Sequence, residues 1–203
     1  MSEQQVRFER AMTLFDAANA EDPNQEEGQP KELLYAKRMS DMLQRFAPDA
    51  SEAVKLAVRA QHIRRWTVPR SSYPMTKEGY YAWRTGLYKF HAETAGALMR
   101  QAGYDEAMIE RVMAAVSKRG LKVNPETQLL EDVTDLVFIE HYMLGFASSK
   151  PDYDEEKWLV IVRKTWNKMS DAAHRFALSG AIKLPEALLP LINKAVTETR
   201  SAS

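Results

Sequence analysis

Apolar residues recur every three or four positions along most of this chain, and this spacing constrains the fold more than any other feature. Such spacing is typical of an amphipathic helix with one buried face. The alternation that marks a half-buried strand is missing, and the one segment rich in β-formers, 159–162, lies inside a longer helical pattern. We therefore predict an all-α fold. The clearest helical face is that of segment 33–46, with Leu33, Leu34, Met39, Met42, Leu43 and Phe46.

Capping and helix-breaking residues divide the chain into seven to eight predicted helices. Thr76 and Asp105 are expected N-caps, and Asn124 precedes a proline at a first helical position. Asp49 and Glu52 form a capping-box pattern. The acidic, turn-rich stretch 20–30 and the proline-containing stretch 66–75 are predicted loops. The predicted helices cover about 3–19, 33–46, 49–63, 76–103, 105–120, 125–143, 153–179 and 185–199.

Composition and charge exclude several classes of protein. The chain has 28 basic and 28 acidic residues, so no net field directs it to nucleic acid or to an anionic membrane surface. It has no cysteine, which excludes disulfides, thiolate metal sites and cysteine nucleophiles. It has neither a membrane-spanning apolar run nor the apolar core of a signal peptide. We expect one cytoplasmic domain over 1–203, and we do not expect it to bind membranes or nucleic acid.

Three polar side chains near apolar helix faces are candidate metal ligands. Without cysteine, a transition-metal site must be built from histidine and carboxylate. His62 ends an apolar helix, His91 lies beside a buried stripe, and Asp132 lies within the apolar segment LLEDVTDLVF. A buried carboxylate must be paired, hydrogen-bonded or bound to a cation. Together these residues could hold one divalent ion and leave positions open for water and substrate.

The same three residues also have a purely structural interpretation. A single histidine on a helix is more often a satisfied residue of the core or its boundary than a ligand. Asp132 could cap a neighbouring helix or pair with an arginine. Spacing alone does not fix the geometry of ligands on three separate helices, as a tight pair of cysteines would. Both interpretations stay open at this point.

Arginine and aromatic residues gather in the loop 66–75 and on its flanks. Arginine forks bind phosphate or carboxylate through two parallel hydrogen bonds, and aromatic rings can stack on a base. The pattern predicts a site for an anionic small molecule, and a solvated basic face is the alternative. The candidate residues are Arg64, Arg65, Arg70, Tyr73 and Arg84, among Trp66, Tyr80, Tyr81 and Trp83, with Lys118 on a later segment that could reach the same pocket.

Three segments resemble the HD-domain superfamily of metal-dependent phosphohydrolases: LAVRAQHIRRW, HAETAGALMRQAGYDEAMIERVMAAV and EDVTD. The resemblance covers about residues 31–145 and implies an HD-like helical bundle, with C-terminal helices over 153–200 packed on it. It also implies one divalent transition metal (Mn, Zn, Fe or Ni) bound by His62, His91 and Asp132. The chain departs from the family pattern at Gln61 and Tyr35, which stand where the family has ligands. We expect these two residues to contact the substrate, and weaker metal ligation is the alternative.

A second resemblance spans most of the chain. The segments PKELLYAKRM, RFAPDASEA, QHIRRWTVPRSSYPM and TQLLEDV are similar to the domain-of-unknown-function 4202 family. That description names no activity, so the functional expectation rests on the HD-like pattern.

The resulting functional hypothesis is metal-dependent hydrolysis of a phosphate-bearing small molecule, either nucleotide-like or another phosphorylated metabolite. A metal ion can lower the pKa of a bound water to about 7 and so supply hydroxide at neutral pH. Glu131 and Lys118 are the candidate catalytic residues, and Glu131 could also act as a neighbour of the ligands that pairs with an arginine. The alternative is a non-catalytic regulatory protein that binds an anion or nucleotide on a degenerate HD scaffold. A homodimer is possible in either case.

Overall fold

The computed structural model describes residues 2–201, and for these residues it confirms the all-α class. Residue 1 and residues 202–203, at the ends of the predicted domain, lie outside the described residues. The chain divides into two compact units, Met1–Leu130 and Glu131–Ser203. Their boundary falls inside α6 (Pro125–Val137) and not near residue 145, where the sequence places the end of the core. That the units form a single domain stays a prediction.

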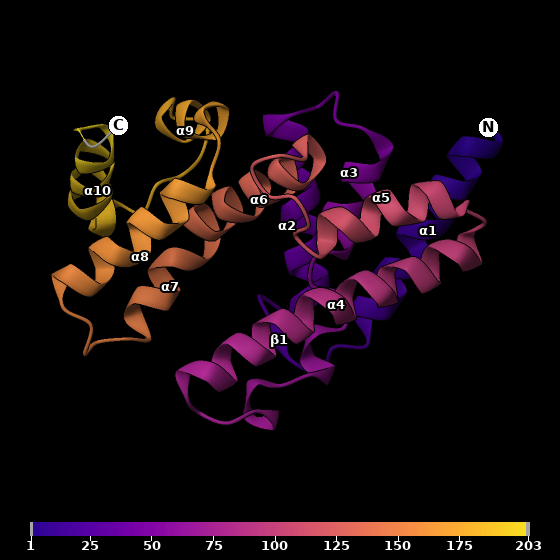
Figure 1. Ribbon diagram of the computed structural model, residues 1–203, viewed down its shortest axis with the longest axis horizontal. Helices are drawn as coiled ribbons and strands as arrows, with labels where there is room; N and C mark the ends of the chain where they lie inside the picture. The colour runs from indigo at the N-terminus through magenta and orange to yellow at the C-terminus, as the bar shows by residue number, and fades with distance from the viewer. Residues whose placement is uncertain (1, 202–203) are drawn as a thin grey trace. The chain divides into compact units, whose positions relative to one another are not determined.

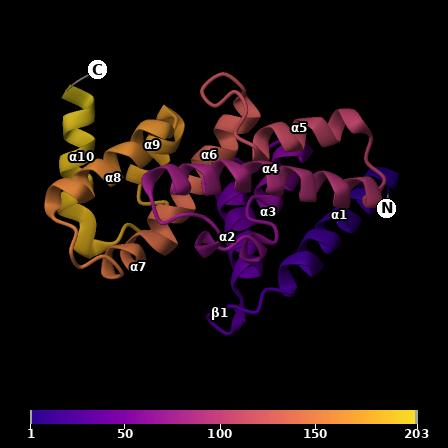
Figure 2. The same cartoon turned by 60° about the horizontal axis from the view of Figure 1, so that its bottom comes forward.

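The first unit is built around its shortest helix, α3. Six of its nine residues are buried, and α3 contacts α1, α2, α4 and α5. A helix that is apolar on most sides must pack against other helices on those sides. Figures 1 and 2 show α4 and α5 lying side by side. The helices are α1 (Glu3–Ala20), α2 (Lys31–Phe46), α3 (Glu52–Ala60), α4 (Lys77–Ala102) and α5 (Glu106–Val116).

A small β-hairpin lies in the stretch predicted as an exposed loop. It pairs β1 (Gln25–Glu26) with β2 (Gln29–Pro30) in antiparallel register. The two turn residues, Glu27 and Gly28, both have positive φ angles, of 52° and 74°. This is the geometry that two-residue hairpin turns prefer. Arg38 of α2 forms ion pairs with Glu26 and Glu27 at 2.5 and 2.7 Å, which hold the hairpin against α2.

The second unit contains α8 (Glu155–Lys168), which contacts α10 (Leu189–Ser201) (Figure 1). The buried residues of α8 are Trp158, Leu159, Val162, Thr165 and Trp166. The segment 159–162, rich in β-formers, is helical, as predicted. The other helices are α7 (Met143–Ser148) and α9 (Asp171–Leu178). Short 3-10 segments are η1 (Arg65–Thr67), η2 (Arg70–Ser72) and η4 (Glu186–Leu188), and η3 (Phe138–Tyr142) is a π-helical segment.

Residues 2–201 contain ten α-helices, more than the predicted seven to eight. The predicted helix 125–143 is interrupted by η3, and the predicted helix 153–179 is broken at Ser170. The Ser170 side chain accepts the N–H of Ala173 at 3.2 Å and so begins α9. Throughout the described chain, no helix combines the length and the hydropathy that a membrane span requires.

The predicted helix starts are mostly confirmed. The side chains of Thr76 and Asp105 accept backbone N–H groups at 3.1 and 2.8 Å and cap α4 and α5. Asn124 accepts the N–H groups of the first turn of α6. The expectation for Asp49 is wrong, because the side chain of Ser51 caps α3 instead, accepting the N–H of Val54 at 3.3 Å. Ser51 directly precedes the first helical residue, which is where a cap is effective.

Candidate functional site

A pocket of about 520 Å³ in the first unit is the candidate site. It is formed by the hairpin, the first turn of α2 and the segment 65–83, and we call it the Glu32 pocket. Sites for small molecules range over roughly 300–1,000 Å³, so its size is suitable. The residues that line it include Lys31, Glu32, Arg65, Trp66, Arg70 and Trp83.

Asp22 joins the hairpin to the start of α2 and so fixes the position of Glu32. The N-cap of α2 is Pro30, which makes no side-chain capping hydrogen bond. Asp22 supplies the cap instead: its Oδ2 accepts the backbone N–H of Glu32 at 3.0 Å. Its Oδ1 accepts the backbone and side-chain N–H groups of Asn24 at 2.9 and 2.8 Å. A carboxylate at a helix N-terminus satisfies free N–H groups and is favoured by the helix dipole.

The Glu32 carboxyl group lines the pocket but is largely removed from water, since the residue is only 7 % exposed. Among the described residues, its side chain makes one polar contact, between Oε2 and His62 Nδ1 at 3.4 Å. Burial raises the pKa of this carboxyl group from 4.5 to about 7, although the positive charge of Arg65 lowers it. At neutral pH the acid and the carboxylate are therefore both populated.

His62 lies between Glu32 and Arg65 and stacks on Tyr35, with ring centroids 4.0 Å apart. Arg65 Nη1 is 3.2 Å from His62 Nε2. A guanidinium group can only donate, so Nε2 accepts and the hydrogen of the neutral ring is on Nδ1, facing Glu32. Burial and the charge of Arg65 hold the pKa of His62 well below its usual value. His62 is therefore a neutral donor toward the carboxyl group.

His91 of α4 is buried, and its ring centroid is 5.9 Å from that of His62. Its Nδ1 is 2.9 Å from the carbonyl oxygen of Ile63, which places the hydrogen on Nδ1. Its Nε2 is buried and has no hydrogen-bond partner among the described residues. Burial, and then the neighbouring His62, lower the pKa of His91 to about 3. The ring is thus neutral, with a free lone pair on Nε2.

The contacts of the three predicted ligands do not fit a metal centre. Both ring nitrogens of His62 face protein partners. Asp132 belongs to the second unit, where its two oxygens accept the backbone N–H and hydroxyl group of Ser170 at 2.7 and 2.6 Å. Within residues 2–201, no group of three or more His, Asp or Glu side chains is placed to hold a metal ion. Bound metal therefore stays a prediction without support from the geometry.

The two predicted catalytic residues lie in different units. Glu131 is buried on α6 and accepts from Lys168 Nζ at 2.8 Å, and Asp135 one turn later accepts from the same nitrogen at 2.7 Å. Burial alone would lower the pKa of Lys168, but Asp135 and Glu131 outweigh it and raise the pKa. Lys118 follows α5 in the left-handed region, with a φ of 62°, and its charge helps to lower the pKa of His62.

Two of the four predicted arginines, Arg65 and Arg70, line the Glu32 pocket. Arg70 is also a structural residue, because its guanidinium group donates to the carbonyl oxygens of Tyr73, Pro74 and Thr76 at 3.0, 2.8 and 3.2 Å. These bonds close the loop that precedes α4. At the first turn of α4, an added Cβ on Gly79 would collide with the Pro74 carbonyl, so loop and helix are in close contact.

The other predicted binding residues are used elsewhere. Arg64 pairs with Glu21 at 2.9 Å, and Arg84 donates to the hydroxyl groups of Tyr88 and Tyr80 at 2.6 and 3.3 Å. Tyr35 is the ring on which His62 stacks. Gln61 is buried, and its Oε1 has no partner among the described residues. The Tyr73 hydroxyl group lies over Gly86 of α4.

Sequence reasoning missed Glu32 and Lys31, which line the pocket at the start of α2. An acidic residue in the first turn of a helix is common, because the helix dipole favours it there. Glu32 therefore looks like an ordinary surface residue. The one local signal is the proline at the helix start, which leaves the cap to be supplied from a distance.

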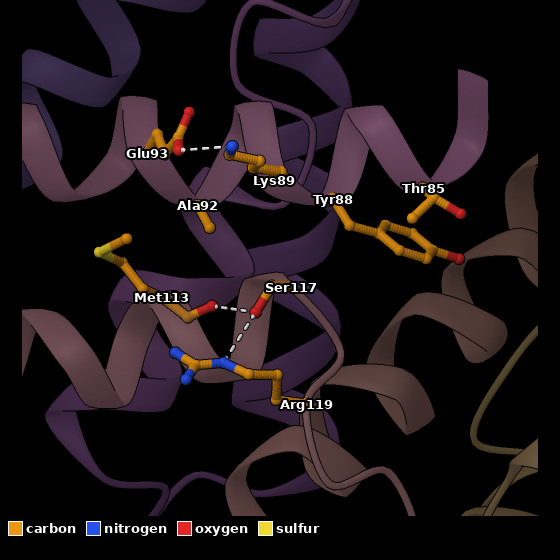
Figure 3. A pocket seen from close by; sticks show the side chains of 8 residues that line it. All are labelled: Thr85, Tyr88, Lys89, Ala92, Glu93, Met113, Ser117 and Arg119. Carbon is orange, nitrogen blue, oxygen red and sulfur yellow. Dashed lines mark hydrogen bonds and ion pairs between the residues drawn. The ribbon is translucent and has the colours of Figure 1, made fainter. Parts of the chain in front are cut away.

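A smaller pocket of about 300 Å³ lies between α4 and α5. Figure 3 shows two contacts among its polar side chains: Lys89 pairs with Glu93, and Arg119 Nε contacts the Ser117 hydroxyl group at 3.4 Å. Arg119 also pairs with Glu110 at 2.6 Å. Since these charges are already paired, this pocket is the weaker candidate for a polar ligand.

Known proteins give one clear relation. No curated protein and no solved structure matches the chain. The model of one family, described as "Domain of unknown function (DUF4202)", matches residues 9–192. This range contains every residue of the Glu32 pocket and most of each unit. The chain therefore belongs to the DUF4202 family.

Proposed function

We propose that the first unit binds an anionic small molecule in the Glu32 pocket. The observation that carries this proposal is a pair of cations, Lys31 and Arg65, that line the pocket without a carboxylate oxygen within 4.0 Å among the described residues. Five other arginines of the same unit are paired with carboxylates at 2.5–2.7 Å: Arg38, Arg59, Arg100, Arg111 and Arg119. Unpaired cations in a cavity are suited to an anionic ligand.

The indole rings support a ligand with a flat or apolar part. Trp83 is fixed by a hydrogen bond from Nε1 to the Val68 carbonyl at 2.9 Å. The guanidinium carbon of Arg65 lies 5.0 Å from the Trp83 ring centroid, so a cation–π contact orients Arg65. Its fork is thereby held in place before a ligand arrives. A phosphate-bearing metabolite, nucleotide-like or smaller, matches this combination of charge and ring surface.

Calorimetric titration of the full chain with inorganic phosphate and with adenosine monophosphate tests the proposal. The variant Arg65→Gln should weaken binding about 10- to 100-fold, as expected for loss of a charge-assisted hydrogen bond. Arg119→Gln is the matched control, because Arg119 pairs with Glu110 outside the pocket. Equal affinities of the wild type and of Arg65→Gln, with both folded by circular dichroism, would overturn the assignment.

Metal-dependent hydrolysis of the bound phosphate compound, on an HD-like scaffold, is the second candidate. It is favoured by the neutral ring of His91, whose buried Nε2 has no hydrogen-bond partner among the described residues, because neutral imidazole is a ligand of divalent transition metals. The contacts described above do not fit the predicted ligand set, so we assign no reaction step to a metal.

Metal content and phosphate release separate this candidate from simple binding. The protein is incubated with Mn, Zn, Fe or Ni salts, desalted and analysed by plasma mass spectrometry beside His91→Ala. Near-stoichiometric metal that is lost in the variant, together with release of phosphate, supports hydrolysis. A wild type that retains none of the four ions excludes the metal-dependent reaction.

A further inference from the structure

Glu32 differs from every other buried carboxylate in the described chain. Asp22, in the same pocket, accepts three hydrogen bonds of 2.8–3.0 Å. Asp132 accepts two from Ser170, and Glu131 and Asp135 each accept one from Lys168. Glu32 has only the contact of 3.4 Å with His62. An ionised carboxylate has about four acceptor sites, and leaving them unused in a buried position is costly.

The pocket therefore presents an acceptor without a good donor, and two cations, Lys31 and Arg65, without an anion; the third cation, Arg70, donates to three backbone carbonyl groups. Arg65 is near enough to lower the pKa of Glu32, yet no Arg65 nitrogen lies within 4.0 Å of the Glu32 carboxyl group. The two opposite charges thus line one cavity without closing on each other. A ligand that carries both charges could satisfy both, whereas a simple anion would bring a second negative charge toward Glu32.

We propose that the Glu32 pocket takes a zwitterionic ligand, whose ammonium group binds the Glu32 carboxylate and whose anionic group binds Arg65 and Lys31. This inference rests on the proposed anion binding and names the class of ligand. The His62 N–H steadies the carboxylate from the side of the protein. Trp66 and Trp83 also line the pocket, and indole rings attract ammonium groups.

A matched pair of phosphate monoesters tests the inference. Phosphoethanolamine and propyl phosphate have nearly the same size and shape, but the ammonium group of the first is replaced by a methyl group in the second. We expect calorimetry on the full chain to show phosphoethanolamine binding at least about tenfold more tightly. Glu32→Gln should reduce this preference to about twofold or less, because the amide removes the negative charge. Arg65→Gln should weaken both compounds.

Each outcome decides one of the two claims. If both compounds bind through Arg65 with equal affinity, or if Glu32→Gln leaves the preference intact, the zwitterionic class is wrong and the anion site stands. If neither compound binds, or if Arg65→Gln changes nothing, both claims fail. Thermal unfolding of Glu32→Gln shows whether the variant is folded. The variant Glu32→Asp, which keeps the charge but shortens the side chain, should keep part of the preference.

Discussion

Buried carboxylates occur in both units, but the two units use them differently. In the second unit, Glu131 and Asp135 share the Lys168 ammonium group, and Asp132 binds Ser170. In the first unit, Glu32 lines a pocket and has one contact of 3.4 Å. The comparison teaches that burial of a carboxylate does not by itself identify a site. A cavity together with a missing partner is the more specific signal.

The largest effect is expected from removing the partner in the second unit. Lys168→Met leaves Glu131 and Asp135 buried without their shared cation. Breaking a buried ion pair in this way typically destabilises a protein by about 3–5 kcal/mol. Urea unfolding of the full chain at pH 7 measures the change. Lys164→Met, at an exposed position of the same helix, is the control and should stay within about 0.5 kcal/mol of the wild type. A loss below about 1 kcal/mol for Lys168→Met contradicts a structural role for this pair.

Replacing Glu32 should increase the stability of the fold at high pH, whereas Lys168→Met decreases it. The pKa of this carboxyl group is raised from 4.5 to about 7 in the folded chain. The protonated form therefore favours the fold, and its contribution is complete below pH 4.5 and lost as the pH rises through 7. Glu32→Gln removes this loss, so the variant should gain up to about 3 kcal/mol on the wild type between pH 4.5 and pH 8.

Urea unfolding at pH 5 and at pH 8 measures this difference, with Glu131→Gln as the contrasting variant. Glu131 is paired with Lys168, so its amide variant should be less stable than the wild type at pH 8. If Glu32→Gln and Glu131→Gln change the unfolding free energy in the same direction at pH 8, the two carboxylates do not differ in the way we describe.

A smaller effect is expected at Ser170, which both accepts from α9 and donates to Asp132. Ser170→Ala removes a helix cap and one hydrogen bond of a buried carboxylate, for a loss of about 1–2 kcal/mol. Ser149→Ala, whose hydroxyl group only bonds back to its own helix, should change stability little. Denaturant midpoints that coincide for the two variants would show that the Asp132–Ser170 contact adds nothing.

Much of the fold could be predicted because the sequence signals for a helix lie within the helix and its caps. The spacing of apolar residues and the caps at Thr76 and Asp105 lie within a few residues of the structure that they determine. The break at Ser170 could not be predicted in the same way. The local part of its cause is the Ser170 cap on Ala173, and the other part is the contact of Ser170 with Asp132, 38 residues earlier in the chain, which no local pattern contains.

The candidate site shows the same division between local and distant signals. The clustering of arginine and tryptophan around residues 65–83 drew attention to Arg65 and Arg70, and both line the pocket. That they bind a ligand stays a prediction. Glu32 could not be found, because its position depends on Asp22 ten residues before it and its environment on His62 thirty residues after it. The role of His62 as a neutral donor likewise depends on Arg65, not on the residue type.

The three carbonyl groups held by Arg70 have a consequence for how fast and how tightly a ligand can bind. A loop that must be ordered on binding adds an entropic penalty to the affinity and a slow step to association. Here the hydrogen bonds of Arg70 order the loop between Trp66 and Trp83 when the chain folds. The entropic cost of ordering this loop is therefore part of folding and does not reduce the affinity for a ligand. The wall of the pocket is therefore preformed. The association rate of a charged metabolite should depend on diffusion and on electrostatic attraction by Lys31 and Arg65.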